Sequence, residues 1–266
     1  MKMNELNLTE EQMKKLRKKI EKSIMDILKR SKTKGVVVGI SGGIDSSVVL
    51  KLVNVVDTYA LIMPEMGLTK NSDVEDAKNL ADDLGVKYNI IEINPVIDSI
   101  EKIFPWHNFS DENRGMVIGN VMARTRMILL YLVANIDRRI VLGTGNKTEI
   151  LLGYTTKYGD AACDILPIGD LYKTQVRQFA EFLGISKRIM KKRPSAGLWK
   201  GQTDEDELGA SYEDIDRILH LLIDKDYTIE KTADELSLPV ELIENINSRV
   251  ERNKHKRVMP KAVKLS

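Results

Sequence analysis

Short apolar runs alternate with amphipathic stretches along the first half of the chain, and this alternation restricts the fold to one class. The runs at 35–40, 58–63 and 139–142 are mostly apolar and rich in branched residues, as are strands buried on both faces. A further run lies at 88–93. Between the runs, apolar residues recur every three or four positions, which is the helical period. The pattern predicts an α/β fold, a Rossmann-like parallel sheet of about five strands with helices on both faces.

The rest of the chain is predicted to be mainly helical. The expected helices of the first part cover about residues 10–31, 44–53, 71–84 and 115–136, and Thr9 with Gln12 forms a capping box before the first. Later helical segments lie near 172–183, 212–223, 228–236 and 239–252, around a loop at 193–209 that is rich in Gly, Ser, Pro and acidic residues. We therefore predict one domain over 1–266, with an α/β core at 1–170, a helical extension at 171–266 and a mobile loop at about 195–209.

The turn after the first apolar run, SGGIDS at 41–46, has the features of a phosphate site. Ligands of open α/β sheets bind beyond the carboxyl ends of the strands, where this turn lies. Gly42 and Gly43 allow close approach of the backbone, and the N–H groups that begin the next helix attract an anion. The turn matches neither the P-loop pattern nor the dinucleotide-binding GxGxxG pattern, which disfavours kinase-type and dehydrogenase functions.

Asp45 is an unexpected residue in an anion site, because a bare carboxylate repels phosphate. It is explained if Asp45 holds Mg²⁺, which bridges carboxylate and phosphate oxygens. The alternative is that the two glycines only turn the chain and Asp45 caps the helix. In the metal-binding role we expect the Asp45 position to face solvent, whereas as a helix cap its carboxylate would face inward.

SGGIDS resembles the pyrophosphate loop of the N-type ATP pyrophosphatases, which cleave ATP between the α and β phosphates and include several synthetases and tRNA-modifying enzymes. Further motifs narrow the choice: NVMARTRM (120–127), GTGNKTE (143–149), GYTTKYGD (153–160), CDILP (163–167), LYKTQV (171–176), PSAGL (194–198), GQTDEDELG (201–209) and HKR (255–257). Together, from about residue 20 to residue 260, the chain resembles the ammonia-dependent form of NAD synthetase. The fold implied is that of the adenine nucleotide alpha hydrolases.

The resemblance implies a two-step ligase reaction that ends NAD biosynthesis. ATP adenylates the nicotinate carboxylate of deamido-NAD and releases pyrophosphate, and ammonia then displaces AMP to give NAD. The family pattern places Gly39, Ile40, Ser41, Gly42, Gly43, Ile44, Asp45 and Ser46 around the ATP phosphates, and Thr144, Lys173 and Ser195 on ATP. It places Asp45 and Glu149 on Mg²⁺, and with Lys173 they are the implied catalytic residues. Arg124, Lys157, Asp164, His255 and Lys256 are implied to contact deamido-NAD.

The chemistry is compatible with these roles. A carboxylate reacts with ammonia only once one of its oxygens belongs to a leaving group, here AMP. Attack at the α phosphate spreads charge over phosphate oxygens, so cations and positioning are expected to dominate catalysis. Arg124 and Arg126 cannot both face a core from one helix, so at least one is expected to point into the cleft above the sheet. The alternative, which the pair by itself favours, is that both are exposed or lie at an interface.

The resemblance also bears on nitrogen source and assembly. Glutamine-dependent relatives carry an added glutaminase domain, whereas the similarity here occupies the whole chain, so free ammonia is the expected nitrogen donor. The family pattern implies a homodimer with the dinucleotide near the subunit boundary. Apolar residues on the long helix are compatible with such an interface and equally with a core: Met116, Val117, Val121, Ile128, Leu132 and Ile136.

Composition limits the remaining alternatives. The net charge of +2 over 266 residues argues against a nucleic-acid partner, and therefore against a tRNA-thiolating or tRNA-lysidine enzyme of the same superfamily. Two candidate metal carboxylates and Lys173 argue against a sensor that binds ATP without turnover. No apolar run approaches the roughly 20 residues that cross a bilayer, so no membrane partner is expected. A single cysteine, Cys163, and an N-terminus unlike a signal peptide favour a cytoplasmic protein.

Overall fold

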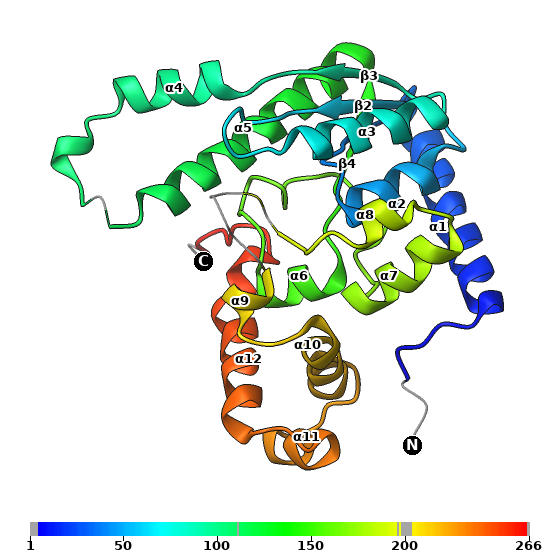
Figure 1. Cartoon of the computed structure of the whole chain (residues 1–266), viewed down its shortest axis with the longest axis vertical. Helices are drawn as coiled ribbons and strands as arrows, with labels where there is room; N and C mark the ends of the chain where they lie inside the picture. Colours follow the sequence, from blue (N-terminus) through cyan, green and yellow to red (C-terminus); the bar gives the residue numbers. More distant parts are fainter. Residues whose placement is uncertain (1–4, 111, 196, 198–203, 265–266) are drawn as a thin grey trace.

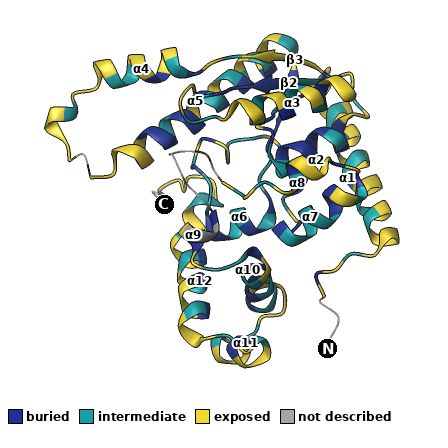
Figure 2. Cartoon of the chain, in the orientation of Figure 1, coloured by how far each residue is buried: buried dark blue, intermediate teal, exposed yellow. Residues whose placement is uncertain are grey.

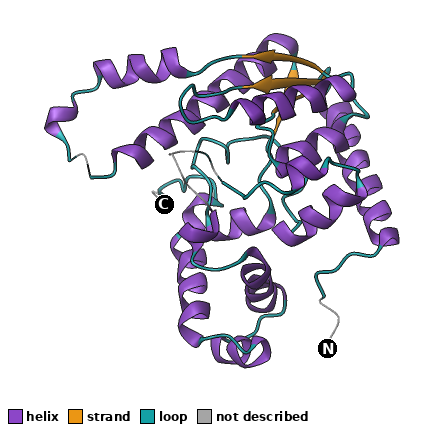
Figure 3. Ribbon diagram, viewed as in Figure 1, coloured by secondary structure: helices purple, strands orange, loops and turns teal. Residues whose placement is uncertain are grey.

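The computed structural model describes residues 5–110, 112–195, 197 and 204–264, and its centre is a parallel sheet (Figures 1 and 3). The strands are β1 (Gly35–Gly39), β2 (Thr58–Ile62), β3 (Lys87–Ile90) and β4 (Arg139–Leu142), in the spatial order β3-β2-β1-β4. Every neighbouring pair is parallel, with Val37 opposite both Tyr59 and Val141. The parallel α/β sheet predicted from the apolar runs is confirmed.

The expected number of strands was wrong, because the described residues form four strands rather than about five. Beyond β4 the chain pairs only through a parallel bridge between Leu142 and Ile165. The Asp164 carboxylate accepts a hydrogen bond from the Val141 backbone N–H, in the place of a strand carbonyl. Pro167 lacks the N–H that a longer ladder needs. The fifth position of the sheet is therefore a short bridge.

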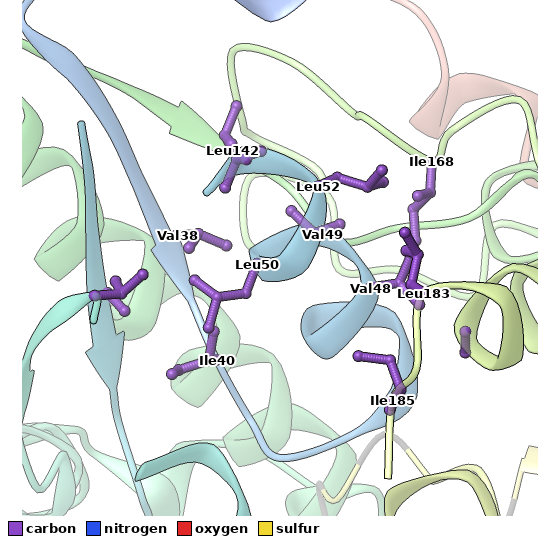
Figure 4. Close-up of a cluster of buried hydrophobic side chains, with 14 of the residues drawn as sticks. Val38, Ile40, Val48, Val49, Leu50, Leu52, Leu142, Ile168, Leu183 and Ile185 are labelled. Atoms are coloured by element: carbon purple, nitrogen blue, oxygen red, sulfur yellow. The ribbon is translucent and has the colours of Figure 1, made fainter. Parts of the chain in front are cut away.

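Helices cover both faces of the sheet, as predicted. One face packs against α1 (Glu10–Ser31), α2 (Ile44–Val53), α3 (Asn71–Asp83), α7 (Lys173–Phe182) and α8 (Lys187–Met190). Figure 4 shows this core, in which Val38 and Ile40 of the β1 edge meet Val49 and Leu50 of α2. The other face packs against α4 (Asn94–Ile103) and α5 (Arg114–Asp137), with Val37 at its centre. Alternate residues of β1 thus belong to different cores, which explains why its sequence is apolar throughout.

The long helix α5 lies on the sheet at its C-terminal half, while its N-terminal half and α4 project from the body (Figure 1). It is the one helix in the described residues whose length and composition alone would allow it to cross a membrane. Arginines interrupt its apolar sequence, so a search for apolar runs does not find it. One side of α5 is buried on the sheet, whereas several of its apolar residues are exposed (Figure 2): Met116, Val117, Ile128, Leu132 and Ile136.

A third core, separate from the two on the faces of the sheet, organises the C-terminal helices. It joins α10 (Tyr212–Leu219), α11 (Ile229–Leu236) and α12 (Val240–Arg252) to Leu152 of α6 (Lys147–Leu152). The predicted loop at 193–209 is partly wrong, since α9 (Asp204–Leu208) lies within it. Residues 196 and 198–203 lie outside the described part of the chain, so the mobility of 195–209 stays a prediction.

Candidate active site

The phosphate turn, residues 39–46, connects β1 to α2 at the carboxyl edge of the sheet. Gly42 has φ +75°, and a Cβ atom there would lie 2.1 Å from the Asp73 carbonyl oxygen, so only glycine fits. Gly43 occupies the N-cap position of α2, and within the described residues no side chain caps this helix. Asp45 is therefore not the helix cap, and the first N–H groups of α2 face the place where an anion would bind.

The two serines of the phosphate turn hold its shape. The Ser46 hydroxyl donates to the Gly43 carbonyl oxygen at 3.1 Å and accepts from the Ser41 backbone N–H at 3.2 Å. It also lies 3.2 Å from the Ser41 hydroxyl. Ser46 is buried, whereas Ser41 is exposed and could reach a ligand. Of the two serines that the family pattern places around the ATP phosphates, Ser46 is thus structural and Ser41 is accessible.

A buried lysine joins the two carboxylates that were predicted to hold metal. Lys173, the first residue of α7, places its Nζ 2.5 Å from Asp45 Oδ2 and 3.4 Å from Glu149 Oε1. The side chains of Asp45 and Glu149 are only 18% and 17% exposed. The expectation that Asp45 faces solvent was wrong, because the α6–α7 region covers the turn. The three implied catalytic residues, which are distant in sequence, form one cluster.

Asn146 was missed from the sequence, although it connects the same groups. Its side-chain amide donates to Asp45 Oδ1 at 2.9 Å, and its Oδ1 accepts from the Glu149 N–H at 3.0 Å. The Glu149 carboxylate in turn accepts from the Asn146 backbone N–H, which completes a capping box at the start of α6. The sequence signal was present, since Asn146 and Glu149 have the spacing recognised at Thr9 and Gln12.

The electrostatics of this cluster favour an additional cation. Burial raises the pKa of the Glu149 carboxyl; Lys173 opposes this shift and Asp45 adds to it. Burial lowers the pKa of Lys173, but its two carboxylate partners more than offset that and the net shift is upward. Lys173 is therefore charged, whereas the raised pKa of Glu149 means that its charged form is disfavoured in this buried cluster. A divalent cation would stabilise that charged form.

Asp216 of α10, which sequence reasoning also missed, anchors the two helices that carry Glu149 and Lys173. It is fully buried and accepts from the Thr148 hydroxyl at 2.5 Å and from the Thr174 N–H at 2.7 Å. Thr148 in turn accepts from the Lys173 backbone N–H at 2.9 Å. One carboxylate thus fixes α6 against the N-terminus of α7. No local pattern marks Asp216, because its partners lie 68 and 42 residues away.

The residues implied to contact the dinucleotide gather around the loop at 153–160. Arg124 of α5 donates two hydrogen bonds to the Lys157 carbonyl oxygen, at 3.1 and 3.3 Å. Lys256 donates to the carbonyl oxygens of Gly153 and Thr155, at 2.7 and 2.8 Å. His255, beside it, is exposed. The structure therefore brings Arg124, Lys157 and the C-terminal basic residues to one loop, from three separate parts of the chain.

Three other candidates have different surroundings. Both Asp164 oxygens have protein partners, the Tyr131 hydroxyl and the Val141 N–H, each at 2.8 Å. Thr144, the second residue after β4, is half-buried, and Ser195 is exposed, with its hydroxyl accepting from the Gly197 N–H. Of the arginine pair on α5, Arg124 is exposed, whereas Arg126 reaches the Met63 carbonyl oxygen beyond β2, at 3.0 Å.

Mg²⁺ fits the residues present. Among the described residues no group of three or more His, Cys, Asp or Glu side chains is arranged to hold a metal ion. Asp45 and Glu149 nevertheless converge on one cation, the Lys173 ammonium, in this structure. Mg²⁺ in nucleotide sites is typically bound by one or two carboxylates together with phosphate oxygens. Asp45 and Glu149, beside the phosphate turn, would supply the two carboxylates of such a site.

Comparison with known proteins gives a consistent result. A family model described as NAD synthase matches residues 16–260. A protein of Pyrococcus horikoshii named NH(3)-dependent NAD(+) synthetase is 44% identical over 247 residues, covering 91% of this chain and 93% of that protein. Among solved structures, an NMN synthetase from Francisella tularensis superposes with a TM-score of 0.83 at 34% identity, covering 97% of this chain and 99% of the other. An NH3-dependent NAD synthetase from Campylobacter jejuni gives 0.78 at 33%, covering 95% and 99%.

Proposed function

The chain belongs to the NAD synthase family, and from this membership and the site geometry we propose that it is an ammonia-dependent NAD synthetase. ATP adenylates the nicotinate carboxylate of deamido-NAD and pyrophosphate leaves. Ammonia then attacks the acyl carbon, and the acyl–oxygen bond breaks to release AMP and NAD. The observation that carries this proposal is the Asp45–Lys173–Glu149 cluster beside an uncapped helix N-terminus, which suits a triphosphate bound with a divalent cation.

Each member of the cluster has a distinct task in this reaction. Bound Mg²⁺ would be held by Asp45 and Glu149 and would offset charge on the phosphate oxygens. Lys173 must then leave the space between the carboxylates, and its ammonium group can move toward the departing pyrophosphate as a point charge. Asn146 keeps the Asp45 carboxylate oriented through its amide hydrogen bond. The α2 N–H groups bind the phosphates, with Ser41 as a further donor.

The dinucleotide is proposed to bind along the loop at 153–160. Arg124, Lys157 and Lys256 supply positive charge for its phosphates, and His255 is exposed beside them. Asp164 is held in place by the Tyr131 hydroxyl and the Val141 N–H. We propose that it contacts the dinucleotide from this fixed position. Thr144, just after β4, and Ser195, in the segment after α8, are proposed to bind ATP.

A second candidate substrate is nicotinate mononucleotide, because one of the similar solved structures is described as an NMN synthetase. The adenylation chemistry is identical, and only the length of the substrate beyond its first phosphate differs. The dinucleotide is favoured because the chain is 44% identical to a protein named as an NAD synthetase, against 34% for the NMN synthetase.

The test is to incubate the protein with Mg·ATP and ammonium, and with deamido-NAD, nicotinate mononucleotide or unmodified tRNA as acceptor. The proposal expects NAD, AMP and pyrophosphate in equal amounts from deamido-NAD. A higher kcat/KM for the mononucleotide would favour the second candidate. Modification of tRNA, or ATP binding with no product, would support the alternatives raised by the sequence. Equal activity with glutamine as nitrogen donor would contradict direct use of ammonia.

The protein is further proposed to act as a homodimer in the cytoplasm, without a nucleic-acid or membrane partner. The exposed stripe of Ile128, Leu132 and Ile136 along α5 supports an interface there, since contiguous apolar surface favours association. We keep the division into a core at 1–170 and an extension at 171–266 as a proposal. In it the core supplies Asp45 and Glu149, and the extension supplies Lys173 and the buried Asp216.

A further inference from the structure

Lys192, just after α8, connects the phosphate turn to α3. Its ammonium group donates to the Gly42 carbonyl oxygen at 2.8 Å and forms ion pairs with Asp73 at 2.6 Å and Asp76 at 2.7 Å. The contact with Gly42 is a hydrogen bond, and the Asp76 oxygen that Lys192 approaches has no hydrogen-bond partner among the described residues, so Lys192 meets it as an ion pair. The side chain of Lys192 is 25% exposed, and that of Asp76 only 6%. The contact spans 150 residues of sequence, so no local pattern indicates it.

These contacts bear on which polar groups of the phosphate turn, carbonyl oxygens or N–H groups, face a bound anion. A carbonyl oxygen directed at phosphate would repel it, whereas the N–H groups of the turn attract it. Lys192 holds the Gly42 carbonyl oxygen on the side of α3. Gly42 has a left-handed φ and lies close to the Asp73 backbone, so few other conformations of the turn fit against α3. Lys192 and Arg188 together offset the charges of Asp73 and Asp76, which would otherwise lie near the phosphate site.

We infer that Lys192 is a positioning residue for ATP, which holds the phosphate turn in its anion-binding conformation through the Gly42 carbonyl oxygen. This inference rests on the proposed role of residues 39–46 in binding ATP phosphates. Lys192 contacts backbone and carboxylates of the protein itself, so its effect on ATP is exerted through the turn. The dinucleotide loop at 153–160 does not share these contacts.

The test compares Lys192→Met, Lys192→Arg and the control Arg188→Met. Arg188 pairs with the same Asp76 at 3.0 Å and reaches the Ser72 carbonyl oxygen, but it does not bind the turn. Calorimetric titration with Mg²⁺ and α,β-methylene-ATP, which cannot be cleaved between those phosphates, measures ATP affinity without turnover. Lys192→Met is expected to raise the Kd about tenfold, which corresponds to about 1.4 kcal/mol. Arg188→Met is expected to change it less than twofold.

Two further readouts separate positioning from general stability. The KM for deamido-NAD should stay within twofold in Lys192→Met while the KM for ATP rises. Lys192→Arg keeps the positive charge but puts a planar guanidinium group where a compact ammonium group fits. Its Kd for the analogue should therefore lie between those of wild type and Lys192→Met. An unchanged Kd in both Lys192 variants would overturn the inference, as would an equal loss in Arg188→Met. If wild type binds the analogue but forms no NAD, the proposed function fails and this inference does not.

Discussion

Replacing Asp216 by alanine should destabilise the fold by about 2–4 kcal/mol. The change leaves the Thr148 hydroxyl and the Thr174 N–H buried without their acceptor. Each such group costs about 1–3 kcal/mol, and relief of the buried charge offsets part of the sum. The expected loss is therefore a large fraction of the stability of an ordinary domain.

Replacing Asp216 by asparagine separates stability from catalysis. The amide has the shape of the carboxylate, so its oxygen can accept from the Thr174 N–H, while its NH₂ group now donates to the Thr148 hydroxyl. The loss of stability should be only about 1 kcal/mol. Thr148 must reorient, and with it the N-terminus of α7 that carries Lys173. A displacement of about 1 Å in a catalytic group can cost roughly 100-fold, so we expect kcat to fall about 10- to 100-fold.

Urea denaturation and steady-state release of AMP measure the two effects in the same preparations. Asp214→Asn is the matched control, because Asp214 lies on the same helix and its carboxylate accepts from the hydroxyl of the N-cap residue Ser211, away from the contacts of Asp216 with α6 and α7. The control should leave kcat within twofold. The reasoning would be refuted if Asp216→Asn kept the wild-type kcat, or if Asp214→Asn reduced kcat as much.

Four further outcomes follow from the same geometry. Asp45→Asn should abolish pyrophosphate release and, because it breaks the buried pair with Lys173, also lower the Tm; retained activity in a release assay would rule out its metal role. Lys173→Met should reduce kcat more than 100-fold, since no ammonium group would then offset the charge of the departing pyrophosphate; a kcat near wild type would show that Lys173 has no part in the reaction. Burial raises the pKa of Cys163 to about 11, so a thiol reagent should react slowly at neutral pH and faster as pH rises, and rapid labelling at pH 7 would contradict this. Ile128→Glu with Leu132→Glu should convert a dimer to a monomer in light scattering, and an unchanged mass would exclude this face.

The elements that could be predicted are those whose cause is local. The apolar runs, the period of the helices and the capping box at Thr9 are each contained within a few residues, and all were found in the structure. The phosphate turn was equally accessible, since Gly42 and Gly43 follow a buried strand. Asp45, Glu149 and Lys173 could be brought together only through the family resemblance, because they come from three elements.

The features that were missed depend on long-range contacts. Asp216 and Lys192 look like ordinary surface charges in sequence, and their partners lie in other elements. The strand count failed because backbone pairing beside β4 is limited to one bridge, next to which the Asp164 side chain takes the Val141 N–H, and periodicity does not reveal this. The solvent-facing position expected for Asp45 failed because its exposure depends on how α6 and α7 cover the turn. Asn146 was the avoidable error, since its capping box is visible in the sequence.

The most direct measurement of the central claim follows one oxygen atom. Deamido-NAD labelled with ¹⁸O in its nicotinate carboxylate is converted with Mg·ATP and ammonium, and the products are analysed by mass spectrometry. If the carboxylate attacks the α phosphate and AMP is then displaced by ammonia, one labelled oxygen appears in AMP and none in pyrophosphate. Label in inorganic phosphate with formation of ADP, or unlabelled AMP beside NAD, would contradict activation as an acyl-adenylate.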